Sequence, residues 1–460
     1  GSNPSLATKP QPSTAGVLLL LQTKESQMDQ PASGSQNQPN ELPASESMPG
    51  WRKQVTVFLV GQTITTFGSM LVQYAILWHL TLTTKSGTIL ALAAVFGFLP
   101  QAIVSIFAGV WADRVNRKIM IIISDSVITL ATLTLALFMF SGIHDLWLIF
   151  LVMAVRSAGT GVQMPAISAL VPQIVPKDKL LRINGINSSL NSSLTILGPV
   201  VAAGLYASFS LEAILIVDVI TAIIGIVLLM TVSVPTLVRV ANAEKPSYFT
   251  DLKEGISYVF THELVRWVIA VFGIVFLLIV APSNLSPLML VRNFGSEVWM
   301  LTVLELAFGV GALIGGALMA IFASKVDRLG TIIGTSIVFG VLAIGLGFTT
   351  NLVVFYVLFF IIGLIVPAFS TSAFTLLQET VEPERQGRVF GFVGIVMAVA
   401  MPLGMAVLGP LADIVSVEIL LIVTGAATVL IAVVAVLLPS GKRAILAAHA
   451  ATGPNTTPVA

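Results

Sequence analysis

The sequence contains no cysteine in its 460 residues, and only 10% of its residues are charged. Without cysteine, the chain cannot form disulfides, a catalytic thiolate or a cysteine-based metal site. Soluble domains carry about 25% charged residues. Since 56% of this chain is hydrophobic, its composition predicts an integral membrane protein. The net charge of +1 gives no indication of a nucleic-acid partner.

Several motifs that carry enzymatic chemistry are also missing. No glycine-rich loop is followed by Lys-Ser or Lys-Thr, which argues against transport driven directly by ATP. No arrangement of side chains typical of catalysis occurs, and no spacing is typical of metal ligands. The sequence therefore predicts a protein that is not an enzyme and has no metal or other cofactor.

Long apolar runs divide the chain into domains. Residues 1–50 are rich in Ser, Pro, Gln and Asn and predict a disordered tail. Runs of about 20 apolar residues, the length that crosses a bilayer, then follow, and because they are continuous they predict helices rather than a barrel. We expect twelve spans, at 55–82, 87–111, 119–140, 146–171, 183–208, 213–234, 265–290, 299–323, 330–349, 352–378, 389–412 and 418–438.

Positive charge predicts the orientation of these spans, because loops rich in Lys and Arg stay in the cytoplasm. One side of the expected topology has only Lys85 and Arg292. We therefore expect both termini and the other side to be cytoplasmic. That side holds Arg52, Lys53, Arg114, Arg117, Lys118, Lys177, Lys179, Arg182, Arg239, Lys245, Lys253, Arg266, Lys325, Arg328, Arg385, Arg388, Lys442 and Arg443.

The longest cytoplasmic connection, 235–264, separates two halves of six spans, 51–234 and 265–440, and residues 441–460 form a second cytoplasmic tail. Tyr248, Leu252, Ile256 and Val259 recur in the connection at helical spacing. This pattern fits a helix on the membrane surface; a plain linker is the alternative.

The two halves also repeat weakly. Residues 164–185 follow span 4 and residues 366–391 follow span 10, and each stretch has a Pro-Ala pair, a later Pro and an Arg-x-x-Gly. Both copies begin on the same side of the membrane. Parallel six-span repeats are a known plan of transporters.

Four charged residues crowd into positions 113–118, within the stretch "GVWADRVNRK". The stretch resembles the G-x-L-A-D-R-x-G-R-K loop between spans 2 and 3 of the major facilitator superfamily. The resemblance covers about residues 50–440 and implies that Asp113 meets the positive end of a helix in the other half, as an inner gate. The residues that it assigns to this gate are Gly109, Asp113, Arg114, Arg117 and Lys118, with Asp125 as a partner of the basic loop. The alternative is a simple positive-inside anchor.

Two further stretches resemble motifs of this superfamily. Span 4 has Arg156 in an R-x-x-Q-G-like pattern, with Gly159 in place of Gln. In span 5, Gly198 and Pro199 match the antiporter signature G-P-x-x-G-G, whose two last glycines are alanines here. The stretches "VRSAGT" and "AMPLG" are most similar to the macrolide-efflux branch of drug:proton antiporters. This resemblance implies drug export coupled to protons.

Three charged residues inside spans are candidates for proton coupling. Arg156 lies roughly 15 Å from the outer end of its span, where a charge costs about 2.5–3.5 kcal/mol or more. It must find an anion or carbonyl groups, and a purely structural contact is the alternative. Glu305 in span 8 could carry the proton or meet a cationic drug, or be an interfacial carboxylate. Asp218 lies in a span that is peripheral in the superfamily, and we hold it as the alternative proton carrier.

Polar residues at helical spacing indicate a substrate cavity. Gln62, Thr66, Ser69 and Gln73 follow span 1. Asn187 and Asn191 follow span 5. Hydrogen bonding between helices is the alternative role for each of them.

These observations predict an all-α membrane protein of twelve helices in two parallel-repeat halves, in the cytoplasmic membrane of a bacterium. We expect a monomeric secondary transporter that exports amphipathic drugs, macrolides first, in exchange for protons, with membrane lipids as its surroundings. A lipid or lysophospholipid transporter of the same fold is one alternative. An uncoupled channel or membrane scaffold is the other.

Overall fold

The computed structural model describes Gly1 and residues 50–234, 248–322 and 327–438, and helices make up nearly all of these ranges. A short 3-10 turn, η2 (Lys177–Lys179), joins two of the helices. The α-helices are α2 (Trp51–Thr84), α3 (Gly87–Arg114), α4 (Arg117–Phe140), α5 (Leu146–Ile174), α6 (Leu180–Ser208), α7 (Leu211–Thr231), α8 (Tyr248–Thr261), α9 (Glu263–Asn293), α10 (Val298–Phe322), α11 (Arg328–Phe348), α12 (Leu352–Thr380), α13 (Pro383–Ile414) and α14 (Val417–Leu437).

The described residues contain the twelve membrane-length helices that the sequence predicts. Each lies within a few residues of its expected span. Short polar side chains fix several starting points, because they accept hydrogen bonds from backbone N–H groups of the first turn. Asp327 accepts from the N–H groups of Leu329 and Gly330 at the start of α11. Asn351 does the same for α12.

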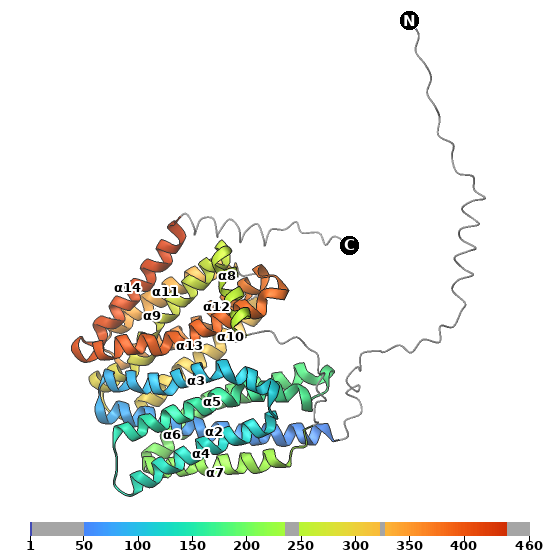
Figure 1. The fold of residues 1–460 in the computed structure, drawn as a ribbon. Helices are drawn as coiled ribbons and strands as arrows, with labels where there is room; N and C mark the ends of the chain where they lie inside the picture. The colour runs from blue at the N-terminus through green and yellow to red at the C-terminus, as the bar shows by residue number, and fades with distance from the viewer. Residues whose placement is uncertain (2–49, 235–247, 323–326, 439–460) are drawn as a thin grey trace. The chain divides into compact units, whose positions relative to one another are not determined.

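The two halves, α2–α7 and α9–α14, repeat the same helix pairings. In the first half α3 packs on α5 and α4 on α7, and in the second half α10 packs on α12 and α11 on α14. Contacts between the halves come mainly from α3 with α13, which lie side by side in Figure 1, and from α6 with α10. The weak sequence repeat therefore corresponds to a repeated three-dimensional arrangement.

The two ends of the helices differ in how the halves meet. We call the end where α2 joins α3 the Lys85 end, and the end where α3 joins α4 the Arg117 end. Near the Lys85 end, one apolar core combines residues of both halves, such as Leu71 and Leu285. Toward the Arg117 end the core splits in two: one belongs to the first half alone and the other to the second half alone.

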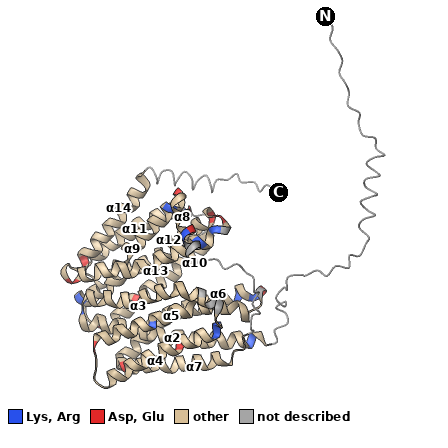
Figure 2. Cartoon of the chain, viewed as in Figure 1, with Lys and Arg blue, Asp and Glu red and all other residues tan. Residues whose placement is uncertain are grey.

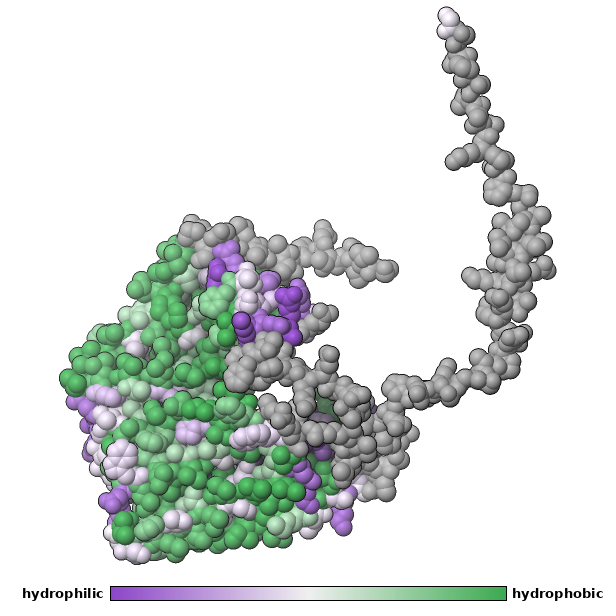
Figure 3. Space-filling view, viewed as in Figure 1, coloured by the Kyte–Doolittle hydropathy of each residue, from purple (hydrophilic) through white to green (hydrophobic). Residues whose placement is uncertain are grey.

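Apolar and charged residues are separated along the helices. Figure 3 shows hydrophobic atoms covering much of the visible surface along the helix lengths. In Figure 2 most Lys, Arg, Asp and Glu residues lie near helix ends. This distribution is what a bilayer selects, since a charged side chain facing lipid is costly.

The connection between the halves contains a helix, whose place on the membrane surface remains a prediction. That helix, α8, packs against α9 and α13. Tyr258 and Val259 are buried in the core of the second half, and a Cβ on Gly255 would lie 2.7 Å from the carbonyl oxygen of Arg388. The apolar face of α8 is therefore occupied, at least in part, by the protein itself.

Candidate functional site

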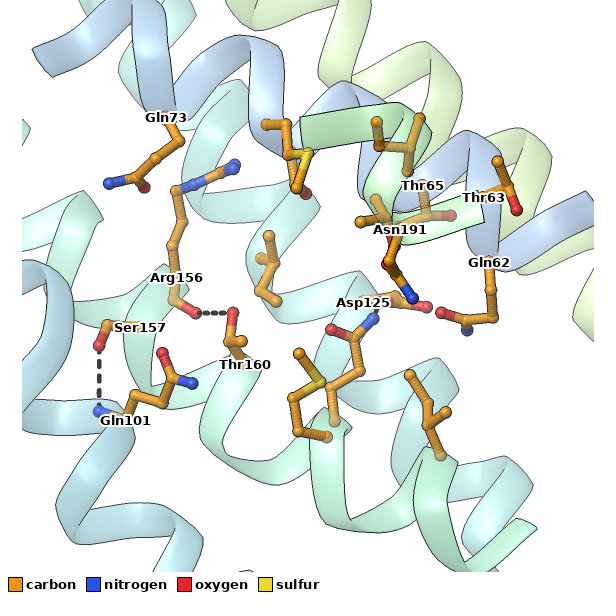
Figure 4. Close-up of a pocket in the computed structure, with 18 of the residues that line it drawn as sticks. Gln62, Thr63, Thr65, Gln73, Gln101, Asp125, Arg156, Ser157, Thr160 and Asn191 are labelled. Carbon is orange, nitrogen blue, oxygen red and sulfur yellow. Dashed lines mark hydrogen bonds between the residues drawn. The ribbon is translucent and has the colours of Figure 1, made fainter. Parts of the chain in front are cut away.

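A cavity of about 280 Å³ lies in the first half, with walls from α2, α3, α4, α5 and α6 (Figure 4). Apolar side chains such as Phe58 and Met153 alternate there with amides, hydroxyls and two charged groups. Mostly apolar walls with a few polar groups are typical of small-molecule sites. The polar lining residues are Gln62, Thr63, Thr65, Thr66, Ser69, Gln73, Gln101, Asp125, Arg156, Ser157, Thr160, Gln163, Asn187 and Asn191.

All six residues that the sequence assigns to a substrate cavity lie in this wall. Gln62, Thr66, Ser69 and Gln73 come from α2, and Asn187 and Asn191 come from α6. Their contact with a substrate remains a prediction. The sequence analysis did not assign Gln101, Ser157 or Gln163 to the cavity.

Arg156 is held by a carboxylate from another helix. Its guanidinium contacts the Asp218 carboxylate of α7 and the Thr132 hydroxyl of α4. Ser69 of α2 donates to the other oxygen of Asp218 over 3.3 Å. Arg156 is 9% exposed and Asp218 is 1% exposed. Four helices of the first half therefore meet at one buried ion pair.

This pairing changes how the roles of Arg156 and Asp218 are interpreted. The sequence presented Arg156 and Asp218 as separate candidates, whereas the structure makes them partners. Arg156 lines the cavity and Asp218 does not; in Figure 4 the Arg156 side chain extends toward the part of the cavity where Gln73 lies. Taking one member of a buried pair away costs about 3–5 kcal/mol, because the remaining charge has no partner. Removing either partner is therefore expected to be costly for the fold.

Asp125 is the second carboxylate of this region and belongs to the cavity wall. The Gln163 amide of α5 donates a hydrogen bond to Asp125 Oδ1. Figure 4 shows Asp125 on the side of the cavity where Gln62 and Asn191 lie. The sequence analysis placed Asp125 with the basic loop at the gate. The structure gives it a cavity position and a partner from α5.

The neighbours of Gly159 give a physical reason why α5 departs from the superfamily pattern at this position. A Cβ at this position would lie 2.6 Å from Cγ1 of Ile128, so a glutamine side chain there would require Ile128 to move. The glutamine on this face of α5 is Gln163, one helical turn further on. Its spacing of seven residues from Arg156 puts both on one helix face. This spacing is the sequence signal that would have identified it.

Glu305 does not join the Arg156–Asp218 pair. It is half-buried in α10, between Leu304 and Phe308 of the core shared by both halves. Its carboxylate interacts electrostatically with Tyr74 of α2. Among the described residues that line the cavity, Glu305 does not appear. It lies where the halves meet.

The antiporter-like residues of α6 lie close to the same tyrosine. Gly198 and Pro199 are both buried. A Cβ on Gly198 would lie 3.5 Å from the Tyr74 ring and 3.8 Å from Met70. These are ordinary van der Waals distances, so the packing of α6 on α2 does not require a glycine here; the part of Gly198 in antiport remains a prediction.

Only part of the predicted gate at the Arg117 end is described. The side chains of Asp113 and Arg114 lie outside the described residues, and a Cβ on Gly109 would meet no heavy atom of the described part of the chain within 4 Å. Lys118 Nζ donates to the carbonyl oxygens of Met230 and Val232, both at 2.7 Å. Lysine is favourable at such carbonyls, which end a helix with partial negative charge. Lys118 therefore ties α4 to α7 within the first half.

A second gate-like contact lies at the Lys85 end. Asp413, near the end of α13, accepts hydrogen bonds from the N–H of Gly87 at 2.7 Å, the N–H of Thr88 at 2.9 Å and the hydroxyl of Ser86 at 2.7 Å. Arg292 of α9 donates to Asp413 Oδ1 at 2.9 Å and to the Lys85 carbonyl at 2.7 Å. A carboxylate at a helix N-terminus is stabilised by the free N–H groups and by the helix dipole. We call this group the Asp413 lock.

Sequence reasoning missed the Asp413 lock, although a signal was present. Residues 409–413 read Gly-Pro-Leu-Ala-Asp, and residues 109–113 read Gly-Val-Trp-Ala-Asp. The contact expected of Asp113, an aspartate on the N-terminus of a helix in the other half, is the one that Asp413 makes at the opposite end. The lock is tight, since a Cβ on Gly87 would lie 2.2 Å from the carbonyl oxygen of Gly409.

Comparison with known proteins agrees with this architecture. The family model described as Major Facilitator Superfamily matches residues 58–405 and, in a second match, 299–458. Macrolide efflux protein A of Streptococcus pyogenes is 31% identical over 392 residues, which cover 85% of this chain and 96% of that protein. Macrolide efflux protein A of Enterococcus faecalis is 32% identical over 315 residues, which cover 68% of this chain and 97% of that protein.

A solved structure shares the fold at much lower identity. A bacterial homologue of the human lysosomal transporter Spinster, in an inward-facing and unoccupied conformation, superposes with a TM-score of 0.65 at 14% identity. The match covers 90% of this chain and all of the other, 100%. At this identity the likeness concerns the fold alone.

Proposed function

Because the chain belongs to the Major Facilitator Superfamily, we propose that it exports amphipathic drugs, macrolides first, in exchange for protons. The observation that carries the proposal is the buried Arg156–Asp218 pair beside a cavity of mixed polarity. The two macrolide efflux proteins, 31% and 32% identical, support the substrate class. The site of action is the cytoplasmic membrane of a bacterium, with both termini in the cytoplasm.

Proton coupling needs an acid that titrates, and arginine does not lose its proton under working conditions. In our proposal the proton binds at Asp218 or at Asp125, both buried beside the cavity. Protonation of Asp218 neutralises the partner of Arg156 and leaves the guanidinium to the cavity. Substrate and proton then compete for one polar network, which is the physical basis of exchange. Glu305 is the remaining candidate, at the junction of the halves.

The difference between the two ends supports alternating access in our proposal. The shared core and the Asp413 lock hold the halves together at the Lys85 end. At the Arg117 end the halves have separate cores. In the orientation that the positive charges predict, the Arg117 end is cytoplasmic. The described conformation is then the one that receives substrate from the cell.

Transport assays test the proposal directly. We expect the chain to raise the macrolide concentration that a host without its own efflux pumps tolerates. In proteoliposomes that contain a pH-sensitive dye, drug movement should be accompanied by opposite proton movement. Leu130→Ala changes a position that is 62% exposed on the helix surface. As a control, this variant should transport like the native chain. Proton-independent macrolide export would contradict the coupling, and transport of lysophospholipid alone would contradict the substrate class.

The lock gives an independent test of alternating access. We expect Asp413→Asn to shift the population toward a conformation open at the Lys85 end by roughly fivefold, since one charged contact with a helix end is worth about 1 kcal/mol. The native chain has no cysteine, so spin labels at Thr83→Cys and Ser296→Cys report the distance across that end. An unchanged distance distribution would show that the lock does not govern opening.

A further inference from the structure

A second hollow, of about 580 Å³, lies on the first half between α2 and α6, near the Arg117 end. We call it the α2–α6 groove. Its walls are apolar apart from two threonines and three cations. The lining residues are Trp51, Arg52, Val55, Thr56, Leu59, Val60, Thr63, Ile64, Lys179, Arg182, Ile183, Ile186 and Leu190.

The cations of the groove gather at one of its ends. Arg52 lies in the first turn of α2, and Lys179 and Arg182 lie where α6 begins. Lys179 is paired with Asp178 at 2.7 Å. Within the described residues, neither Arg52 nor Arg182 has an ion pair. All three are exposed, so this end attracts an anion.

The rest of the groove is apolar and has the depth of one lipid leaflet. From Trp51 to Ile64 the α2 helix rises about 20 Å at 1.5 Å per residue. Half of the hydrocarbon core of a bilayer is about 15 Å thick. Val60 is 46% exposed and Ile186 is 41% exposed, so the wall presents apolar surface for an acyl chain. Trp51, at the basic end, is the residue type that favours the headgroup level.

From this geometry we propose that the α2–α6 groove binds an anionic phospholipid, with the headgroup phosphate at Arg52 and Arg182 and an acyl chain along α2. Both parts of the ligand are needed to explain the groove. A free phosphate leaves the apolar depth uncovered, and a zwitterionic lipid leaves two cations without a net counter-charge. Anionic lipids of the cytoplasmic leaflet attract Lys and Arg side chains that lie near the membrane surface.

The groove is separate from the drug cavity but shares a wall with it. Thr63 and Leu190 line both hollows. A lipid in the groove therefore touches the α2 and α6 side chains that bound the cavity. The proposal concerns a site outside the transport pathway and stands whether or not the substrate is a macrolide.

Trp51 makes the site observable. The chain has 6 tryptophans, so the signal of Trp51 is the difference in fluorescence between the native chain and Trp51→Phe. The full chain is placed in vesicles of zwitterionic phosphatidylcholine, and brominated phosphatidylglycerol or brominated phosphatidylcholine is added as quencher. We expect the anionic lipid to quench Trp51 at a concentration about tenfold or more below that of the zwitterionic one.

Matched charge variants make the test specific. Arg52→Gln with Arg182→Gln removes two groove cations, and Lys53→Gln with Lys253→Gln removes two exposed cations of the same end outside the groove. We expect the first pair to abolish the anionic preference and the second to keep it. Equal quenching by both lipids, or equal loss in both variants, would overturn the proposal. So would the absence of Trp51 quenching by either lipid, because another part of the chain would then cover the groove.

Discussion

The two halves share one arrangement of helices but differ in what they bury. The first half buries Asp125, Arg156 and Asp218, whereas the buried polar residues of the described second half are only serines and threonines. In place of charge, the second half has rows of stacked phenylalanines, such as Phe272 on Phe369 with ring centroids 5.3 Å apart. One scaffold therefore carries two kinds of interior.

This difference indicates a division of work between the halves. Charges buried in a membrane protein are costly and usually serve ions or substrates. The first half has such charges next to a cavity, and in our proposal it is the half that binds protons and polar substrate groups. The described interior of the second half is held by apolar packing instead.

The largest effect on stability and transport should follow from removing one member of the buried Arg156–Asp218 pair. Asp218→Ala leaves Arg156 without its anion, and we expect a loss of about 3–5 kcal/mol in stability together with loss of transport. The double variant Arg156→Met with Asp218→Leu makes the first half resemble the second. It should regain stability, seen as a higher melting temperature in detergent, yet remain inactive. Normal transport by the double variant would refute a role for the pair.

Removing one hydroxyl from each half sharpens the comparison. Thr132 Oγ1 bonds Arg156, and hydrogen bonds to charged groups contribute about 1.5–3 kcal/mol, so Thr132→Val should be destabilising by that amount. Ser372 Oγ is buried and has no hydrogen-bond partner among the residues that the structure describes. Ser372→Ala should therefore leave the melting temperature unchanged or raise it. Equal losses in the two variants would mean that the halves do not differ in this respect.

Asp125 tests whether the first half has a second working acid. Asp125→Asn keeps the size of the side chain and an oxygen that accepts from Gln163, but cannot release a proton. We expect proton-coupled export to fall about tenfold, which corresponds to about 1.4 kcal/mol, with folding preserved. Drug and proton fluxes are compared in proteoliposomes, and Gln163→Ala shows how much of the effect comes from the hydrogen bond. Unchanged coupled flux would leave Asp218 as the acid of this half.

The smallest effect is expected in the second half. Glu305 lies apart from the pair and outside the cavity wall, so Glu305→Gln should lower coupled export by less than about threefold. The same flux assay decides the matter. Drug movement without proton counterflow in this variant would assign the proton to the second half and reverse the comparison.

The fold followed from the sequence because its cause is local. Twenty apolar residues cross a bilayer whatever their neighbours are, so spans such as 418–438 and the observed Val417–Leu437 nearly coincide. The cavity residues of α2 were accessible for a similar reason, since helical spacing places Gln62, Thr66 and Gln73 on one face. The partners of the buried charges could not be predicted from the sequence. The contact of Asp218 with Arg156 joins positions 62 residues apart, and no periodicity within one helix reports it.

The contact of Gly87 with Gly409 also affects what a mutation at either position would do. Here α3 and α13 meet backbone to backbone, and a Cβ on Gly409 would lie 2.5 Å from the carbonyl oxygen of Gly87. An alanine at either position adds one methyl group to this seam and nothing to the cavity. We expect such a change to alter how readily the halves separate at the Lys85 end and to leave the residues that line the cavity as they are. The positions that govern how fast the halves separate can therefore differ from the positions that line the cavity.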